Sequence, residues 1–185
     1  MSTATPTTGI THAGANANKF LSFCLGAEQY GVEILRVREI IGLIAITPLP
    51  QAPDYVKGVM NLRGRIIPVI DLRAKFGLAR VDATKETCII VMEGGGSADA
   101  TSGDALVMGV VVDSVREVQD IPREHIEPAP EFGCSVPLDY IQGMGKVKER
   151  VVILLNISRV LSTSERAGLG AAVAQADSVG ARKAA

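Results

Sequence analysis

The sequence predicts a mainly β protein built from two small barrels that pack against each other. Its 185 residues contain many short runs of β-branched and apolar residues, separated by turn signals at close spacing, and only brief helical patterns. One run, residues 58–72, has the pattern of a β-hairpin, and this pattern returns later in the chain. Two copies of one β unit predict two barrels, each small enough to depend on an apolar seam shared with the other.

The hairpin has two expected strands, Val59–Leu62 and Arg65–Leu72, joined by the two-residue turn Arg63-Gly64. Gly64 stands where such a turn commonly needs a positive φ, which glycine adopts without a Cβ clash. The second strand is apolar on both faces, so we expect it to be buried. Pro68 has no N–H to donate to a neighbouring strand and therefore predicts a bulge or an edge position.

The internal repeat rests on two ungapped alignments that occur in the same order along the chain. Residues 55–76 align with residues 140–161, and residues 31–40 align with residues 109–118. Chance could supply either alignment alone. Both together indicate a duplicated β unit.

Ahead of the hairpin, a tail rich in Thr, Ala, Gly and Asn (residues 1–18) is expected to be flexible. Apolar and polar residues alternate over residues 19–25 and again over residues 30–34, with the period of two that is typical of strands. We expect residues 35–41 to continue as a strand or as a bent extension of one.

Short connecting elements complete the first half. The prolines of Thr47–Pro50 predict an extended segment, because each proline fixes φ and restricts the residue before it. Residues 54–57 predict one helical turn, which Gly58 closes as a left-handed cap. After the hairpin, residues 73–76 predict another short turn that stops at Gly77.

The second half repeats this plan. Residues 88–92 and 106–112 predict two strands, and the Gly- and Ser-rich residues 93–104 between them predict a long mobile loop. Beyond Glu165 the Ala- and Gly-rich chain is expected to fray. The other expected elements are a helical turn at residues 122–126, an extended segment at residues 127–130, a buried strand at residues 151–155, and a C-terminal helix of about two turns that Asn156 caps and that ends at Leu161.

These elements divide the chain into a flexible N-terminal tail (residues 1–18), a folded domain (residues 19–162) and a C-terminal tail (residues 163–185). Within the domain we expect barrel halves at about residues 19–80 and 85–155, with an exchange of strands between them left open.

Composition argues against several functions. Apolar residues make up 47% of the chain and charged residues 21%, as in soluble globular proteins. The net charge of −1 and the low aromatic content of 4%, without tryptophan, argue against nucleic acid as a partner. A signal-peptide pattern and long apolar runs are missing, so we expect a cytoplasmic protein without direct membrane insertion.

The reactive side chains predict no catalytic residue, metal ligand or cofactor. Cys24, Cys88 and Cys134 are odd in number and widely spaced, which favours thiols of a cytoplasmic protein over a metal site. His12 falls in the tail, and we expect His125 to lie at the surface. The nucleophile-elbow, zinc-protease and phosphate-loop motifs do not occur.

The repeat separates features of the fold from features of one copy. Residues 61–64 (NLRG) do not recur, because the second copy has residues 146–149 (KVKE) in their place. One interpretation is a plain tight turn. The other is that Arg63 presents its planar guanidinium to a partner from a rigid turn. Arg38-Glu39 recurs as Arg116-Glu117, which favours a structural role for that pair.

Over about residues 19–162, the chain resembles the CheW family of bacterial chemotaxis coupling proteins. The run N-L-R-G followed by I-x-P-V-x-D-L is specific for CheW-like domains, which the histidine kinase CheA and the fused adaptor CheV also carry. The chain has no room for a kinase or receiver domain, so the stand-alone adaptor is favoured. The motifs that carry the resemblance are residues 30–40 (YGVEILRVREI), 58–73 (GVMNLRGRIIPVIDLR), 109–113 (GVVVD) and 128–132 (PAPEF).

The resemblance implies two five-stranded SH3-like barrels around a common core. It also implies a non-enzymatic adaptor that couples methyl-accepting chemotaxis receptors to the regulatory domain of CheA in membrane-associated arrays. The residues that match receptor-binding positions are Val37, Glu39, Asn61, Arg63 and Gly64. The candidates for kinase binding are Leu21 and Ile34, in an apolar patch, and Gly58, at a turn whose disturbance is expected to perturb partner binding.

Two alternatives stay open from the sequence. One is a CheW-like scaffold of a chemosensory pathway other than chemotaxis. The other is a small-barrel protein that binds a ligand or nucleic acid.

Overall fold

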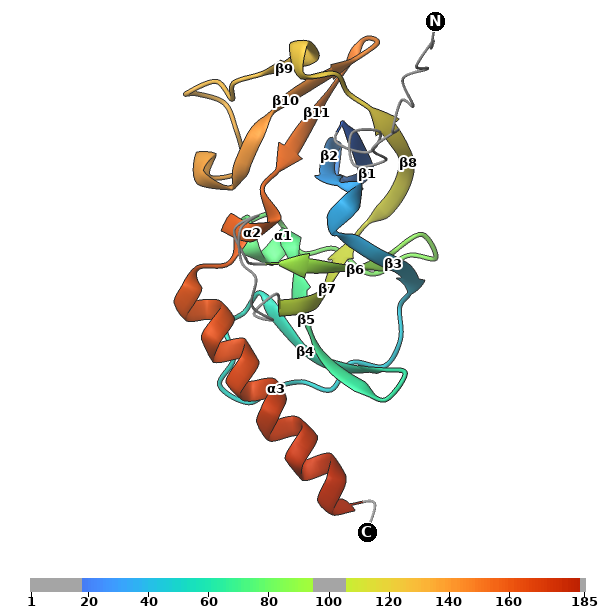
Figure 1. Cartoon of the computed structure of the whole chain (residues 1–185), viewed down its shortest axis with the longest axis vertical. Helices are drawn as coiled ribbons and strands as arrows, with labels where there is room; N and C mark the ends of the chain where they lie inside the picture. Colours follow the sequence, from blue (N-terminus) through green and yellow to red (C-terminus); the bar gives the residue numbers. More distant parts are fainter. Residues whose placement is uncertain (1–17, 95–105, 184–185) are drawn as a thin grey trace, which may run out of the picture.

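A computed structural model describes residues 18–94 and 106–183. Figure 1 shows two β-sheets, one above the other, with a long helix beside the lower one. The upper sheet has the strand order β8-β1-β2-β11-β10-β9, and the lower sheet has the order β3-β6-β7-β5-β4. The predicted mainly β fold, with two SH3-like barrels, is confirmed, although the two-residue β9 adds a sixth strand to the upper sheet.

The strands of the upper sheet are β1 (Lys19–Leu25), β2 (Glu28–Glu33), β8 (Ser114–Asp120), β9 (Ile126–Glu127), β10 (Ile141–Val147) and β11 (Arg150–Leu155). The strands of the lower sheet are β3 (Val37–Gly42), β4 (Val56–Leu62), β5 (Arg65–Asp71), β6 (Cys88–Gly94) and β7 (Leu106–Val112). The helices are α1 (Leu72–Lys75), α2 (Ile157–Val160) and α3 (Thr163–Lys183), with the 3-10 turns η1 (Ile34–Arg36), η2 (Arg123–His125) and η3 (Leu138–Tyr140).

The two copies of the repeat exchange their first hairpins. The first copy places β1 and β2 in the upper sheet and β3, β4 and β5 in the lower sheet. The second copy places β6 and β7 in the lower sheet and β8, β10 and β11 in the upper sheet. The sheets therefore do not coincide with the sequence halves 19–80 and 85–155, because strands are exchanged between them.

The exchanged hairpins join through two parallel strand pairs, β2 with β11 and β7 with β5. Gly31 faces Leu154 in the first pair, and Gly109 faces Val69 in the second. A Cβ on Gly31 would lie 2.9 Å from Leu154 Cδ2, and a Cβ on Gly109 would lie 2.8 Å from Ile89 Cγ2. At Gly31 the lack of a side chain makes room for the partner strand itself, whereas at Gly109 it makes room for side chains of the flanking β6 and β4.

The apolar core has three parts. The largest cluster lies between the sheets and takes residues from both, including Phe23 and Tyr30 of the upper sheet and Ile70, Ile90 and Met108 of the lower sheet. Two smaller clusters fill the individual sheets, one around Met60 and one around Phe20. The shared seam expected from the sequence is the dominant part of the core.

The β4–β5 hairpin is confirmed, but the predicted helical turn before it is wrong. Val56 and Lys57 already belong to β4, which bulges between Val56 and Gly58. Gly58 has the expected positive φ, of 140°, yet it serves the bulge and not a helix end. The cause is distant in sequence, since Thr47 and Val59 exchange two 2.8 Å backbone hydrogen bonds beside it.

The strand–helix junctions follow the prediction in part. Asp71 caps α1 by accepting a 2.9 Å hydrogen bond from Arg73 N, and the turn ends before Gly77, which has a φ of 71°. In the second copy α2 has four residues, so it is shorter than the predicted two turns. Asn156 stands at its N-cap position without a side-chain hydrogen bond.

Beyond Glu165, where the sequence predicted fraying, the described chain is helical as far as Lys183. The 21-residue helix α3 begins with a capping box, in which Ser162 Oγ accepts from Glu165 N and Glu165 Oε2 accepts from Ser162 N. Glu165 Oε1 also accepts hydrogen bonds from Lys75 Nζ at 2.6 Å and from the Tyr55 hydroxyl at 2.5 Å. Leu169 is buried in the main core.

Two predicted segments fall largely outside the described residues. These are the N-terminal tail, of which only Asn18 is described, and the 93–104 loop, of which Glu93 and Gly94 are described as the end of β6. Within the described residues, no helix is long and apolar enough to span a membrane.

Replacing Gly58 by alanine should be strongly destabilising. A Cβ there would lie 2.0 Å from Thr47 O, and a φ of 140° is a conformation that side chains rarely allow. We expect Gly58→Ala to lower the free energy of unfolding by more than about 3 kcal/mol in urea denaturation. Gly42→Ala is the control, because a Cβ at Gly42 meets nothing within 4 Å. Equal stabilities of the two variants would contradict this account of the bulge.

The hydrogen bonds that Lys75, Tyr55 and Ser162 donate to Glu165, which we call the N-terminal clamp of α3, should make stability depend on pH. Burial raises the pKa of Glu165, but the hydrogen bonds from Lys75, Tyr55 and Ser162 outweigh it and lower the pKa from 4.5 to about 2. The ionised carboxylate therefore stabilises the fold above pH 4.5, and this contribution is lost as the pH falls towards 2. We expect Glu165→Gln to unfold at a lower urea concentration than the wild type at pH 7, and this difference to shrink between pH 4.5 and 2. A difference that stays constant down to pH 2, or an equal loss in the exposed-loop control Glu131→Gln, would refute the clamp.

Candidate partner-binding site

The β4–β5 turn is a tight two-residue reversal whose conformation is supported from within. Arg63 and Gly64 both have positive φ, 52° and 84°, as in type I′ hairpin turns. Such a φ is unfavourable for a residue with a side chain, so Arg63 must be held in it. The hairpin imposes this conformation, and Asn61 supports the turn further, because its Oδ1 accepts a 2.8 Å hydrogen bond from Gly64 N. The N-L-R-G run is thus a self-supporting turn that displays its arginine.

The Arg63 guanidinium reaches across to Glu39 on β3. Arg63 Nη2 donates to Glu39 Oε2 at 2.9 Å, and Arg63 Nη1 donates to Oε1 at 3.3 Å. The strands β3 and β4 are the two ends of the lower sheet's strand order, so this bidentate pair connects opposite edges of one sheet. Arg63 nevertheless keeps 79% of its side chain exposed, whereas Glu39 keeps 26%.

A groove with a volume of about 480 Å³ runs beside this pair. Arg38 next to Glu39 pairs with Glu93, donating from Nε to Oε1 at 2.6 Å. The groove is therefore lined by apolar strand residues and by charged residues, among which Arg63 and Glu39 pair with each other. Its lining includes Arg38, Glu39, Leu62, Arg63, Pro68, Val91 and Val107 from the sheet, and Gly170, Val173 and Asp177 from α3.

The structure brings four of the five predicted receptor-binding residues together. Asn61, Arg63 and Gly64 form the turn, and Glu39 is joined to it by the ion pair. Val37 lies on the same strand as Glu39, but it is half-buried and packs against the main core. Its side chain is less accessible than the sequence alone suggested.

The predicted kinase-binding residues do not form one exposed surface. Leu21 is 3% exposed and belongs to the main core, so its side chain is unavailable to a partner of the folded chain. Gly58 is buried in the bulge of β4, where it shapes the backbone. Ile34 is half-buried in η1, and the next residue, Leu35, is 64% exposed.

The equivalent turn of the second copy shares the positive φ of its first residue but differs in its second residue and in its chemistry. Lys148, which aligns with Arg63, has a φ of 56°. Its neighbour is Glu149 in place of Gly64, and Lys146 stands in place of Asn61. Lys146 instead forms an ion pair with Glu127 on the neighbouring β9 at 2.7 Å. The positive φ therefore belongs to the duplicated fold, whereas the Asn61–Gly64 bond and the Arg63–Glu39 pair belong to the first copy.

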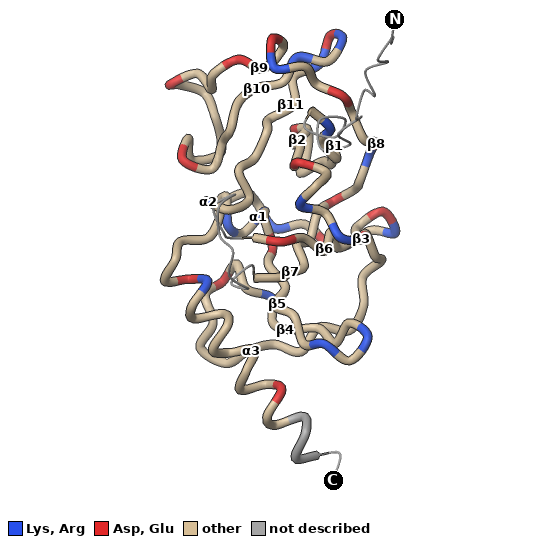
Figure 2. Tube along the Cα trace, viewed as in Figure 1, with Lys and Arg blue, Asp and Glu red and all other residues tan. Residues whose placement is uncertain are grey.

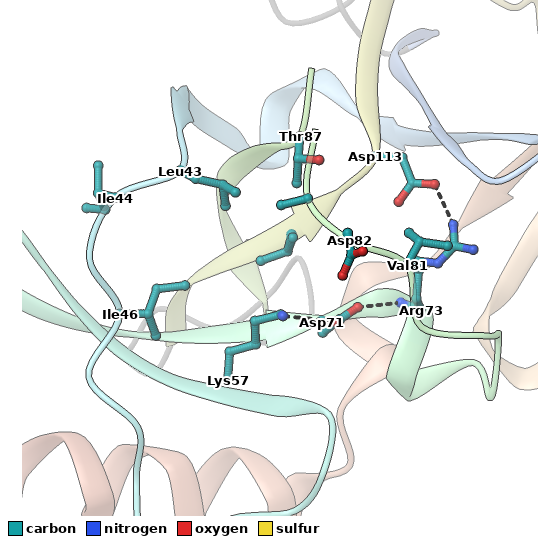
Figure 3. A pocket seen from close by; sticks show the side chains of 12 residues that line it. Leu43, Ile44, Ile46, Lys57, Asp71, Arg73, Val81, Asp82, Thr87 and Asp113 are labelled. Carbon is teal, nitrogen blue, oxygen red and sulfur yellow. Dashed lines mark hydrogen bonds and ion pairs between the residues drawn. The ribbon is translucent and has the colours of Figure 1, made fainter. Parts of the chain in front are cut away.

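A second charged cluster, shown in Figure 3, joins the sheets. The guanidinium of Arg73, which follows β5, is bonded to Asp113. Asp113 Oδ2 also accepts a 2.7 Å hydrogen bond from Gly26 N in the β1–β2 turn, and Asp71 pairs with Lys57 at 3.4 Å. The adjoining pocket holds about 200 Å³. Because its charges are satisfied by one another, this cluster acts as a structural link between the sheets.

Comparison with known proteins agrees with this geometry. The model of the CheW-like domain family matches residues 19–165. The chain is 42% identical over 149 residues to the chemotaxis protein CheW of Klebsiella aerogenes, covering 80% of this chain and 84% of that protein. It is 34% identical over 143 residues to the chemotaxis protein CheW of Helicobacter pylori, covering 77% and 81%.

The chain belongs to the CheW-like family. A solved structure supports this at the level of the fold. The crystal structure of the scaffolding protein TtCheW from Thermoanaerobacter tengcongensis superimposes with a TM-score of 0.69 at 31% identity, covering 80% of this chain and 90% of that one. The family connects the chain with chemotaxis-type signalling.

Sequence analysis of this CheW-like chain missed the part that α3 plays at the groove. Val173 and Asp177 of α3 line the groove together with Arg63, and they lie four residues apart on one face of the helix. A local signal for this helix was present, because Ser162 and Glu165 have the spacing of a capping box. The residues after Glu165 are mostly Ala and Gly, so they show no clear apolar periodicity from which the helix could be predicted.

The Arg63–Glu39 pair should contribute little to stability despite its good geometry. An arginine that is 79% exposed is well solvated, so we expect a coupling energy below about 1 kcal/mol in a double-mutant cycle of Arg63→Ala and Glu39→Ala. Urea unfolding of the four proteins measures it. A coupling energy above about 2 kcal/mol would contradict this, because the pair would then serve mainly to stabilise the fold.

Proposed function

We propose that this CheW-like chain is a non-enzymatic adaptor that couples methyl-accepting chemotaxis receptors to a CheA-type histidine kinase. The observation that carries this proposal is the display of Arg63, an exposed guanidinium on a rigid turn whose supporting bonds are specific to one copy of the repeat. Because the duplicated fold does not require this feature, binding to a partner is the best explanation for its presence in one copy. The relatives named chemotaxis protein CheW support the pathway.

The receptor-binding surface is proposed at the turn and groove formed by Glu39, Asn61, Arg63 and Gly64. An arginine fork held in place by a carboxylate binds a partner with little loss of side-chain entropy. Because 79% of the Arg63 side chain stays exposed while it pairs with Glu39, a receptor carboxylate can join the pair and Glu39 keeps its partner. Val37 contributes only its exposed edge.

The kinase-binding surface is proposed around η1, where the half-buried Ile34 is followed by the exposed Leu35. Gly58 would act there only indirectly, through the shape of β4. Leu21 is not retained, because its side chain lies in the core. Two separate surfaces on one rigid body would fix the kinase close to the receptor, so that a small shift in the receptor could bias the kinase's conformation.

The charge distribution fits a protein partner better than nucleic acid. Figure 2 shows Lys and Arg interspersed with Asp and Glu over the described residues, with a local basic cluster at the tip of the β4–β5 hairpin. A nucleic-acid surface would present a continuous basic stripe. Under this proposal the chain is cytoplasmic and joins membrane-associated arrays through its receptor.

Arg63→Ala should weaken receptor binding without unfolding the protein. We expect about a fivefold or greater loss of affinity for receptor-containing membranes in co-sedimentation, because exposed arginines at the centre of an interface are frequent hot spots. The melting temperature should change by less than about 3 °C, since the side chain is 79% exposed.

Lys148→Ala is the matched control, because Lys148 occupies the equivalent turn with a φ of 56°. It should leave co-sedimentation unchanged. The proposal fails if both variants bind receptor membranes as the wild type does, or if both lose binding to the same extent.

A further inference from the structure

The helix α3 covers the lower sheet next to the proposed receptor groove. The helix packs against β5, and its residues between 164 and 179 line the two grooves described below. Only its C-terminal end extends past the sheet, as Figure 1 shows. On one side of α3 lies the groove of Arg63. On the other side lies a second, larger and mainly apolar groove of about 1030 Å³, whose lining includes Leu49, Pro53, Val56, Val59 and Ile66 facing Leu169, Ala172 and Ala176 of α3. Ile66 borders both grooves.

The attachment of α3 is concentrated at its beginning. Glu165 is bonded to Lys75 and Tyr55, and Arg166 Nη1 donates to Ser158 O at 2.6 Å. The Lys75 side chain is only 8% exposed, and its ammonium lies 4.2 Å from the centre of the Tyr55 ring. Within residues 163–179, where burial is described, Leu169 alone is buried. Nothing comparable holds α3 after this point in the described residues.

The helix is also intrinsically weak where it passes the grooves. Gly168 and Gly170 lie in its interior, yet a Cβ on either would meet nothing within 4 Å, so packing does not require glycine at these positions. Only three of its 21 residues are large and aliphatic, namely Leu169, Val173 and Val179. The segment after Gly170 is too short to be stably helical in water without support. Release of this segment from the sheet should therefore accompany its unfolding.

We propose that the second half of α3 is a displaceable cover, which occupies in cis a helix-binding surface that extends from the Arg63 groove across Ile66 to the apolar groove. The inference rests on the proposed function. The partner that binds this surface is a helix with an apolar face, and it takes the place of α3. The site is continuous with the Arg63 groove, and a helix already lies on it. The N-terminal clamp keeps α3 attached while its remainder opens, so the cover competes with the partner at a high local concentration.

The test uses two pairs of substitutions in the full-length chain, with opposite effects on helix propensity. Gly168→Ala with Gly170→Ala strengthens α3 without any clash. Ala171→Gly with Ala174→Gly weakens it at two exposed positions. Affinity is measured for a soluble cytoplasmic fragment of a methyl-accepting receptor. Backbone amide exchange in α3, relative to β5, is measured on the free proteins.

If α3 competes with the partner, the alanine pair should bind the fragment more weakly and the glycine pair more tightly, by up to about fivefold per substitution, the factor typical of a helix-interior Gly–Ala exchange. The amides after Gly170 should exchange faster than those of β5, more so in the glycine pair and less so in the alanine pair.

Equal affinities, or tighter binding by the alanine pair, would overturn the proposal, because α3 would then be neutral or would itself contact the partner. Exchange of α3 only together with β5 would also overturn it. If no variant binds the fragment, the adaptor proposal fails, and the exchange measurement still decides whether α3 opens.

Discussion

The parallel pairing of β2 with β11, and of β7 with β5, is the constraint on which the rest of the structure depends. Each pair inserts a hairpin from one copy of the repeat into the sheet of the other, so neither sheet can form from one copy alone. Gly31 leaves room for Leu154 of its partner strand, and Gly109 leaves room for Ile89 and Met60 beside its pair. The large core between the sheets, and the link from Arg73 to Asp113, follow from this exchange. The two barrels are consequently one rigid body.

In the proposed adaptor role, this rigid body acts through the geometry of its surfaces. The β4–β5 turn illustrates this, since Asn61 holds its backbone and Glu39 orients the arginine. The second copy keeps the positive φ at Lys148 but lacks the glycine and the asparagine. Its turn therefore connects β10 and β11 without the side-chain support that the Arg63 turn has. In this CheW-like chain, the proposed receptor surface is distinguished more clearly by the difference between the two copies of the repeat than by any single motif. The helix α3, which is not part of the repeat, lines one part of the Arg63 groove.

Most of the strands could be predicted from the sequence because their signals are local. The alternation in β1 and the apolar run of β5 specify strands directly, and Gly64 specifies the turn between β4 and β5. The bulge at Gly58 could not be predicted, since the positive φ is imposed by Thr47, whose backbone approaches from a segment distant in sequence. The helix α3 was missed because it depends on Lys75 and Tyr55, far away in the chain. Leu21 was misplaced as a docking residue because its strand is buried on both faces.

The most direct test of the adaptor role is the amount of CheA-type kinase that sediments with receptor-containing membranes as this chain is titrated in. If one molecule of the chain binds a receptor and a kinase through separate surfaces, co-sedimented kinase should rise, pass through a maximum and fall at excess, when receptors and kinases are occupied by different molecules of the chain. An amount of kinase that does not depend on the chain at any concentration would contradict this account.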